Sequence, residues 1–337
     1  MVPRVVFIQL MLSPLLKMWL HRSIQVCYIC QLFSSAYVPL TRRFLEWAHE
    51  HWVWFSHGQQ NQVADIQLVH DYLNRGIPVG GLDVDSEWST GINNMLWDLT
   101  KYPNATAMIS ELKALGVHTL LWITSMIDED SSNFAYAKEH GYFIKGMDGV
   151  EVIKWWHGHG AFIDYTNPEG LAWWHSQMDA LLDIGVDGFK TDGTDGFVYE
   201  MIEAIGYNGT HISPREYATA YYSDFFNYPR SRSLPGPEGL IMCRPVDSFF
   251  NDFYHQFAPR DVVFAGWVGD QDPTFSGLID ALNNMFHSAW DGYVNFGSDI
   301  GGYRGGNDPP LGRSAQELSR WAQVGAFNPL MENGGDN

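Results

Sequence analysis

The sequence predicts an α/β fold of the TIM (β/α)8 barrel type, and two features of its pattern carry the prediction. From residue 46 to the end, short apolar segments alternate with helix-like segments, which is typical of a parallel sheet. The short segments number eight, and eight βα steps favour a closed barrel over an open sheet.

The predicted elements follow one another at regular intervals. The expected strands are short apolar runs at residues 47–55, 79–85, 118–124, 186–192, 240–244, 262–270, 293–299 and 326–331. The expected helices lie at residues 62–74, 106–115, 275–287 and 314–324. The second of these is amphipathic and is stopped by Gly116. Residues 141–165 are rich in Trp and Gly, and we expect them to form a long loop over the barrel mouth.

The first 37 residues differ from the rest, because they contain no Asp or Glu. Basic residues Lys17 and Arg22, an apolar run over 24–33 and the small residues 34–36 resemble a secretory signal segment. A disordered leader is the alternative. We therefore expect a leader over 1–37, a barrel over 38–337 and a secreted protein. The chain ends where an eighth helix would follow, which suggests a barrel truncated at its C-terminal end.

Charge and cysteine content narrow the function classes. The formal net charge of −19 and the isoelectric point of about 4.9 disfavour a nucleic-acid partner, because the phosphate backbone would be repelled. A neutral carbohydrate meets no such penalty. No apolar run reaches the length of a membrane span. Cys27 and Cys30 form a CxxC pair, but no second CxxC and no matching His pair follows, so we do not expect a zinc site there. We also expect no cofactor.

Charged residues gather at the predicted strand ends, where TIM barrels carry their chemistry. Asp85, Asp192, Arg244, Asp270 and Asp299 each stand at or near such an end. A single Asp there could merely cap the next helix. Four acids and one arginine at the same end of one barrel predict a site that works through carboxylates.

Hydrolysis of a glycosidic bond needs two carboxyl groups in different protonation states. Asp192 follows Lys190 by two residues, and a nearby cation favours the ionised form that a nucleophile needs. Asp270 stands in the sequence Trp267-Val-Gly-Asp, where the indole supplies an apolar wall and Gly269 lets the backbone turn. An apolar setting favours the protonated form that a general acid needs.

These segments resemble glycoside hydrolase family 31 over about residues 46–333. The nucleophile motif is similar to residues 189–192, the acid/base motif to 267–270, and the Gly-x-Asp-Ile-Gly-Gly-aromatic signature to 297–303. Further matching segments, in the family order, lie at 97–98, 102–103, 121–123, 164–168 and 320–327.

The resemblance implies a retaining α-glycoside hydrolase that acts by double displacement. Asp192 would be the nucleophile and Asp270 the acid/base. The residues that would line the main sugar subsite are Asp85, Trp122, Lys190, Arg244, Trp267 and Asp299. One departure concerns sugar specificity, because Glu332-Asn-Gly334 replaces the Arg-x-His of the family after the eighth strand.

Two rival functions remain open. In a metal-dependent hydrolase, the pairs His49 and His51 or His157 and His159 could serve as ligands, although neither pair has HExxH spacing. In the second rival, the barrel would bind carbohydrate without turning it over.

Overall fold

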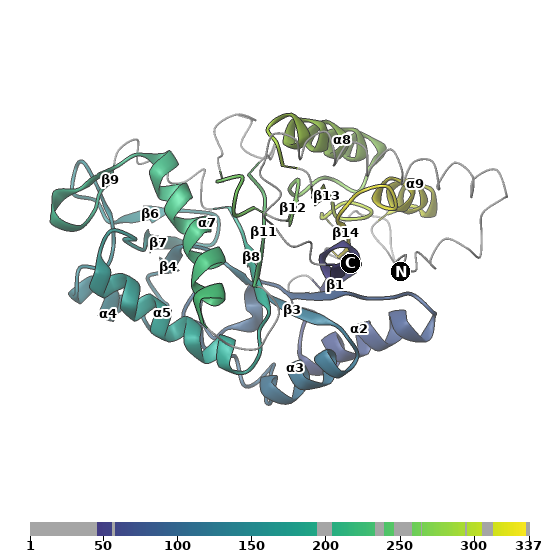
Figure 1. The fold of residues 1–337 in the computed structure, drawn as a ribbon, viewed down its shortest axis with the longest axis horizontal. Helices are drawn as coiled ribbons and strands as arrows, with labels where there is room; N and C mark the ends of the chain where they lie inside the picture. The colour runs from purple at the N-terminus through teal and green to yellow at the C-terminus, as the bar shows by residue number, and fades with distance from the viewer. Residues whose placement is uncertain are drawn as a thin grey trace.

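The computed structural model describes residues 46–55, 58–193, 204–232, 239–245, 258–263, 265–293, 295–304 and 313–334. A parallel eight-stranded sheet lies at the centre of the molecule, with helices packed around it (Figure 1). The TIM-barrel prediction is therefore confirmed.

The barrel strands follow the order of the chain around the ring. They are β1 (His51–Phe55), β2 (Gly81–Val84), β3 (His118–Ile123), β8 (Gly188–Thr191), β11 (Leu240–Cys243), β12 (Ala265–Trp267), β13 (Phe296–Gly297) and β14 (Met331–Asn333). The last strand, β14, pairs in parallel with β1. A parallel bridge between Asp299 and Glu332 joins the end of β13 to β14 and completes the ring.

Apolar side chains fall into two clusters, as expected for a barrel wrapped in helices. The larger cluster lies between the sheet and the surrounding elements, and includes Val53, Leu121 and Phe189. The smaller cluster fills the barrel interior with residues that alternate along the strands, and includes Trp52, Leu120, Leu240, Met242, Ala265, Trp267 and Leu330. The next inward positions on the same strands carry the polar residues of the site.

Most of the helices begin at side-chain caps that the sequence encodes locally. They are α2 (Gln62–Asn74), α3 (Ala105–Ala114), α4 (Phe134–Glu139), α5 (Pro168–Asp183), α7 (Pro214–Ser231), α8 (Phe275–Trp290) and α9 (Ala315–Gly325). Asn61 caps α2 by accepting hydrogen bonds from the backbone of Val63 and Ala64. Ser213 and Ser314 form capping boxes at α7 and α9. The helices α4, α5 and α7 were not among the predicted elements.

Three predicted elements need correction. The first strand begins at His51 and not at residue 47, because Glu46–His49 forms a 3-10 helix. The excursion over residues 141–165 is not simply a loop, because it contributes strands to two small antiparallel sheets, which lie at the left of Figure 1. One sheet joins β4 (Met126–Asp128), β7 (His159–Phe162) and β6 (Val152–Lys154); the other joins β10 (His211–Ile212), β9 (Ala204–Ile205) and β5 (Lys145–Gly146). These strands are too short to leave a periodic signal.

The eighth strand also begins later than predicted. The helix α9 runs to Gly325, and the backbone then turns through Phe327 and Asn328, whose amides donate to carbonyls of residues 324 and 325. Only residue 331 of the predicted segment belongs to β14. In the part of the chain described above, none of the helices combines the length and apolar character required to cross a membrane.

Candidate active site

Asp192 lies directly after β8, where three groups hold its carboxylate. Oδ2 accepts a hydrogen bond from the Trp122 indole at 2.9 Å, and Oδ1 accepts one from the Gly193 amide at 2.6 Å. The Arg244 Nε lies 2.7 Å from Oδ1. From α7, the Tyr221 hydroxyl donates to the Asp192 carbonyl at 3.0 Å and fixes the backbone. The carboxylate is thus held in one orientation at the strand end.

Arg244 connects the two predicted catalytic carboxyls. Its Nε contacts Asp192, and its Nη1 lies 3.0 Å from Oδ1 of Asp270. Asp270 follows β12, one residue after Gly269, which has a φ of 94°. The Arg244 side chain is largely buried over the Trp267 ring, with 5.5 Å between the guanidinium carbon and the ring centroid. A single cation therefore offsets the repulsion between two carboxylates that the barrel brings together.

Beneath these groups, a buried ion pair forms the floor of the site. The Lys190 Nζ lies 2.9 Å from Oδ2 of Asp83, and both side chains are at most 5% exposed. The ammonium also lies 4.2 Å from the Trp54 ring centroid and 4.8 Å from that of Trp267. Burial raises the pKa of Asp83 to about 7, and the charge of Lys190 opposes that rise.

Two further acids, Asp299 and Glu332, face this floor from β13 and β14. Asp299 accepts a hydrogen bond from the Trp54 indole at 3.2 Å. Among the described residues, Oδ2 of Asp299 and both carboxyl oxygens of Glu332 have no hydrogen-bond partner. Burial raises the pKa of Asp299 to about 7 and the pKa of Glu332 well above its ordinary value, with Lys190 opposing both shifts. These unpartnered oxygens are buried beneath the mouth of the barrel.

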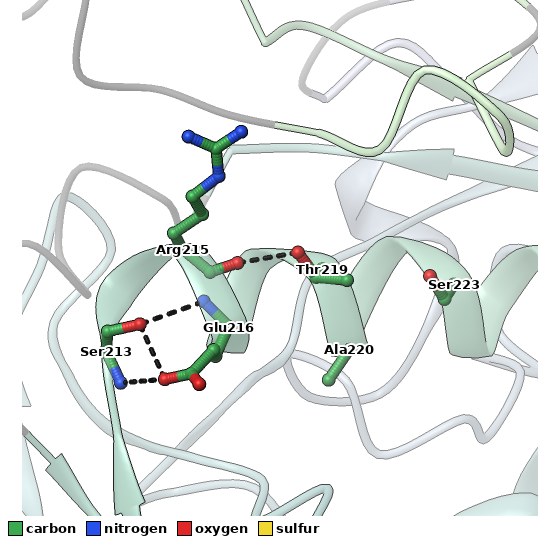
Figure 2. Close-up of a pocket in the computed structure, with 6 residues that line it drawn as sticks. All are labelled: Ser213, Arg215, Glu216, Thr219, Ala220 and Ser223. Carbon is green, nitrogen blue, oxygen red and sulfur yellow. Dashed lines mark hydrogen bonds between the residues drawn. The ribbon is translucent and has the colours of Figure 1, made fainter.

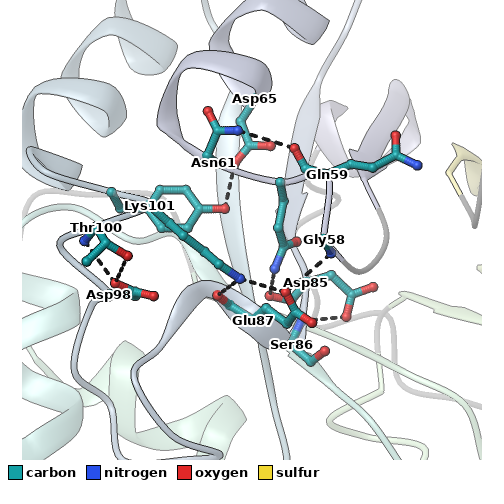
Figure 3. A network of polar contacts seen from close by, with 12 residues as sticks. Gly58, Gln59, Asn61, Asp65, Asp85, Ser86, Glu87, Asp98, Thr100 and Lys101 are labelled. Atoms are coloured by element: carbon teal, nitrogen blue, oxygen red, sulfur yellow. Dashed lines mark hydrogen bonds and ion pairs between the residues drawn. The ribbon is translucent and has the colours of Figure 1, made fainter.

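Asp85 is positioned by the turn that follows β2, shown in Figure 3. Its carboxylate accepts from the Ser86 amide at 2.6 Å, and its carbonyl accepts from the Gln60 side chain at 2.9 Å. Two residues further on, Glu87 forms an ion pair with Lys101 at 2.6 Å. The network attaches the turn to the start of α2 and keeps Asp85 at the rim of the barrel.

The structure places the predicted residues near one another at the strand ends. Inward-facing positions at the strand ends bring together Asp85, Trp122, Lys190, Asp192, Arg244, Trp267, Asp270 and Asp299. Their catalytic and binding roles stay predictions. Sequence reasoning did not assign Asp83 or Trp54 to the site, and it treated Glu332 only as a departure after the strand. The signal for Asp83 was present, because it precedes Asp85 by two residues on one strand and therefore faces the same side.

The structure explains why glycine stands at position 334, where the family pattern after the eighth strand has His. A Cβ atom at this position would overlap the Trp54 indole, so the indole occupies the space that a side chain at 334 would need. The same indole donates to Asp299 and covers Lys190. Trp54 and Gly334 therefore depend on one another.

Other segments that resemble the family have structural roles here. Asp164 accepts hydrogen bonds from the backbone and hydroxyl of Thr166, and Asn167 caps α5. Trp97 packs against Tyr102, whose hydroxyl donates to the buried Asp65 at 2.9 Å. These residues stabilise the scaffold around the site.

The histidines considered as metal ligands are dispersed. His49 contacts the Pro329 carbonyl, and burial lowers the pKa of His51 to about 4. His157 pairs with Asp128, whereas His159 is exposed. Across the described ranges, His, Cys, Asp and Glu side chains form no group of three or more that could hold a metal ion. Cys27 and Cys30 lie outside those ranges.

A separate hollow lies along the first turns of α7 (Figure 2). Its lining consists of Ser213, Arg215, Glu216, Thr219, Ala220 and Ser223. The carboxylate of Glu216 is used by the capping box of the helix. We therefore assign the chemistry to the barrel mouth and not to this hollow.

Comparisons with known proteins agree with this geometry. The family model described as "Glycosyl hydrolases family 31 TIM-barrel domain" matches residues 45–337. The chain is 26% identical over 268 residues to an α-xylosidase of Emericella nidulans, covering 77% of this chain and 32% of the relative. It is 24% identical to α-glucosidase 2 of Bacillus thermoamyloliquefaciens, covering 83% of this chain and 35% of the relative. The chain thus spans about a third of the length of these relatives.

Solved structures show the same fold. A GH31 α-xylosidase from a soil metagenome, complexed with xylose, superposes with a TM-score of 0.69 at 24% identity, covering 90% of this chain and 43% of that one. A cycloalternan-forming enzyme from Listeria monocytogenes gives a TM-score of 0.74 at 20% identity, covering 90% and 30%.

Proposed function

The chain belongs to glycoside hydrolase family 31, and we propose that its barrel hydrolyses α-linked glycosides with retention of configuration. One observation carries the proposal: Arg244 contacts both Asp192 and Asp270, at 2.7 Å and 3.0 Å. Retaining enzymes hold their two carboxyls closer together than inverting enzymes do. Two carboxylates on one guanidinium support the closer arrangement.

In the first half of the reaction, Asp192 is the nucleophile. One carboxylate oxygen forms a bond to the anomeric carbon while the bond to the leaving oxygen breaks. Asp270 donates its proton to that oxygen, so the leaving group departs as a neutral alcohol. The hydrogen bond from Trp122 to Asp192 keeps the other carboxylate oxygen in place.

In the second half, water completes the exchange. Asp270 accepts a proton from water while the water oxygen bonds to the anomeric carbon, and the ester bond to Asp192 breaks. Asp85, Asp299 and Lys190 are proposed to bind hydroxyl groups of the sugar. The carboxylates of Asp192 and Asp270, whose side chains are 15% and 23% exposed, support a neutral substrate that brings hydroxyl donors.

The decisive experiment uses the variant Asp192→Ala with 4-nitrophenyl α-glycosides, starting with the xyloside and glucoside because the relatives include an α-xylosidase and an α-glucosidase. We expect loss of turnover, and we expect added azide to form a glycosyl azide in the vacated space. The exposed Asp130 is a control, and Asp130→Ala should retain normal turnover. Near-normal turnover in Asp192→Ala would reject the assignment. Sugar binding without turnover by the unaltered protein would favour the carbohydrate-binding alternative.

We also propose that the protein is secreted, with residues 1–37 as the leader, which lies outside the described residues. Asn104 and Asn208 stand in Asn-x-Thr sequons and are exposed, which supports accessibility to glycosylation. Expression in a eukaryotic secretory host followed by endoglycosidase treatment tests this. Protein found only in the cell and unchanged in mass would contradict it.

A further inference from the structure

The hydroxyl group of Tyr221 lies between the ends of two barrel strands. Tyr221 belongs to α7, and its side chain is fully buried. Its hydroxyl lies 3.0 Å from the Asp192 carbonyl oxygen and 3.3 Å from that of Ile123. These carbonyls belong to the first residue after β8 and to the last residue of β3. One buried donor from outside the sheet thus contacts the backbone of the predicted nucleophile and of the neighbouring strand.

The regular pairing of β3 with β8 ends at this place. The last paired position on β3 is Ile123, and the Asp192 amide donates to its carbonyl at 2.9 Å. Gly193 follows, and a glycine restricts the backbone little. The Trp122 indole, from the last residue but one of β3, donates to the Asp192 carboxylate at 2.9 Å. Tyr221 therefore holds the two backbones that carry this side-chain contact where the ladder stops.

The helix that carries Tyr221 is anchored on two sides. Three polar contacts, spaced one helical turn apart, join α7 to α5: His175 with Asp224 at 2.7 Å, Tyr228 with Asp179 at 2.6 Å, and Arg232 with Asp183 at 2.6 Å. The Tyr221 ring also packs edge to face on Phe225, which packs in the same way on Phe189 of β8. The hydroxyl is thus presented by a helix whose position against the sheet is fixed, as the support of an active-site group requires.

We propose that Tyr221 is a positioning residue for the nucleophile. By fixing the backbone of Asp192, its hydroxyl aims the carboxylate at the anomeric carbon and preserves the hydrogen bond from Trp122. The inference rests on the proposed function, because Tyr221 acts only through Asp192. A displacement of about 1 Å in a reacting group can cost on the order of 10²-fold in rate. Loss of the hydroxyl should therefore slow turnover, although the buried Tyr221 touches no substrate.

The first test compares Tyr221→Phe with a matched variant on the same helix. Phe keeps the buried ring and removes only the donor. Because Asp192 bonds to the substrate only as the reaction proceeds, kcat and kcat/KM for a 4-nitrophenyl α-glycoside should fall together, by about 10- to 100-fold. Tyr217, one turn earlier, is also buried and donates to the Ile163 carbonyl at 3.0 Å. Tyr217→Phe should lower Tm about as much as Tyr221→Phe but keep the wild-type kcat/KM.

The second test separates slow chemistry from a smaller fraction of folded protein, and its probe is an α-configured cyclitol epoxide. A carboxylate oxygen of Asp192 bonds to one epoxide carbon, the bond from that carbon to the epoxide oxygen breaks, and this oxygen takes the proton of Asp270. Mass spectrometry then measures the ester formed. Tyr221→Phe should be labelled about 10- to 100-fold more slowly than the unaltered protein, but to the same final extent. Replacing Tyr221 with 4-aminophenylalanine restores a donor and should recover most of the rate.

Three results would overturn the proposal. One is a wild-type kcat/KM and labelling rate in Tyr221→Phe, and another is an equal loss of kcat/KM in Tyr217→Phe. The third is a lower final extent of labelling at the wild-type rate, because the hydroxyl would then serve folding alone.

Failure of the proposed function gives different results. If Asp192→Ala kept its turnover, or if the label were found on another residue, the catalytic assignment would fail and the role of Tyr221 with it. If the unaltered protein turned over no glycoside, labelling of Asp192 would still test Tyr221, because it requires a single addition. A protein that did neither would overturn both proposals.

Discussion

Replacing Lys190 by Met should destabilise the protein strongly, because the variant leaves a buried carboxylate without its cation. Asp83 is 1% exposed and its Oδ2 lies 2.9 Å from the Lys190 ammonium. Removing one partner of a buried ion pair typically costs about 3–5 kcal/mol. The ammonium also faces the rings of Trp54 and Trp267 at 4.2 Å and 4.8 Å, and Met retains the packing but not the charge.

The expected loss of stability is large compared with the total stability of a protein domain. Domains are stable by about 5–15 kcal/mol, so this single loss could remove a third or more of the total. A change of 1 kcal/mol moves Tm by about 2–4 °C in domains of 150–250 residues and by less in larger ones, which predicts a fall in Tm of at most about 6–20 °C. Lys101→Met is the matched control, because its partner Glu87 is 39% exposed and an exposed pair is worth about 0–1 kcal/mol.

The loss of stability caused by Lys190→Met should depend on pH, and the titration of Asp83 determines the direction of this dependence. Its pKa in the folded protein, raised to about 7 even beside Lys190, rises further when the cation is removed. The folded variant then holds a proton that the unfolded chain releases above its ordinary pKa of about 4. The loss of stability should therefore be larger at pH 8 than at pH 5, by up to about 1.4 kcal/mol for each pH unit above 7.

Thermal denaturation followed by circular dichroism measures the Tm of each variant at each pH. The double variant Lys190→Met with Asp83→Asn should melt above the single variant at pH 8, because it removes the uncompensated charge. Equal melting of Lys190→Met and the unaltered protein at pH 8 would refute the reasoning. Failure of Asp83→Asn to raise the Tm of the single variant would refute it as well.

Three further predictions concern the same site. Burial raises the pKa of Asp299 to about 7, so the free energy of unfolding should fall as pH rises from about 4 to 7, and Asp299→Asn should flatten that slope in urea denaturation. Gly334→Ala should displace the Trp54 indole, cost about 1–3 kcal/mol and alter near-ultraviolet circular dichroism; an unchanged spectrum would contradict the overlap. Asp270→Ala should slow substrates with poor leaving groups far more than activated aryl glycosides, and equal losses in steady-state kinetics would mean that Asp270 is not the general acid.

Much of the barrel was predictable because its signals are local. The helix α2 occupies the predicted residues 62–74, since Asn61 and the apolar pattern act within a few positions. Strand periodicity likewise predicted β3 and β8 to within a few residues. The same reasoning did not find the strands of the excursion, because β5, β6 and β7 are only two to four residues long. In addition, β5 and β7 pair with β9 and β4, which are distant in the sequence.

In the candidate site too, some features could be predicted from the sequence and others only from the tertiary structure. The sequence alone determined which acids stand at strand ends, and hence that Asp192 and Asp270 would lie at one mouth of a barrel. Only the tertiary structure decided that Arg244 bridges them, that Trp54 fills the space beside Gly334, and that Asp128 orients His157. Strand alternation is fixed by backbone geometry over two residues, whereas these contacts join side chains from separate strands and hairpins, whose distances depend on how the barrel closes and packs.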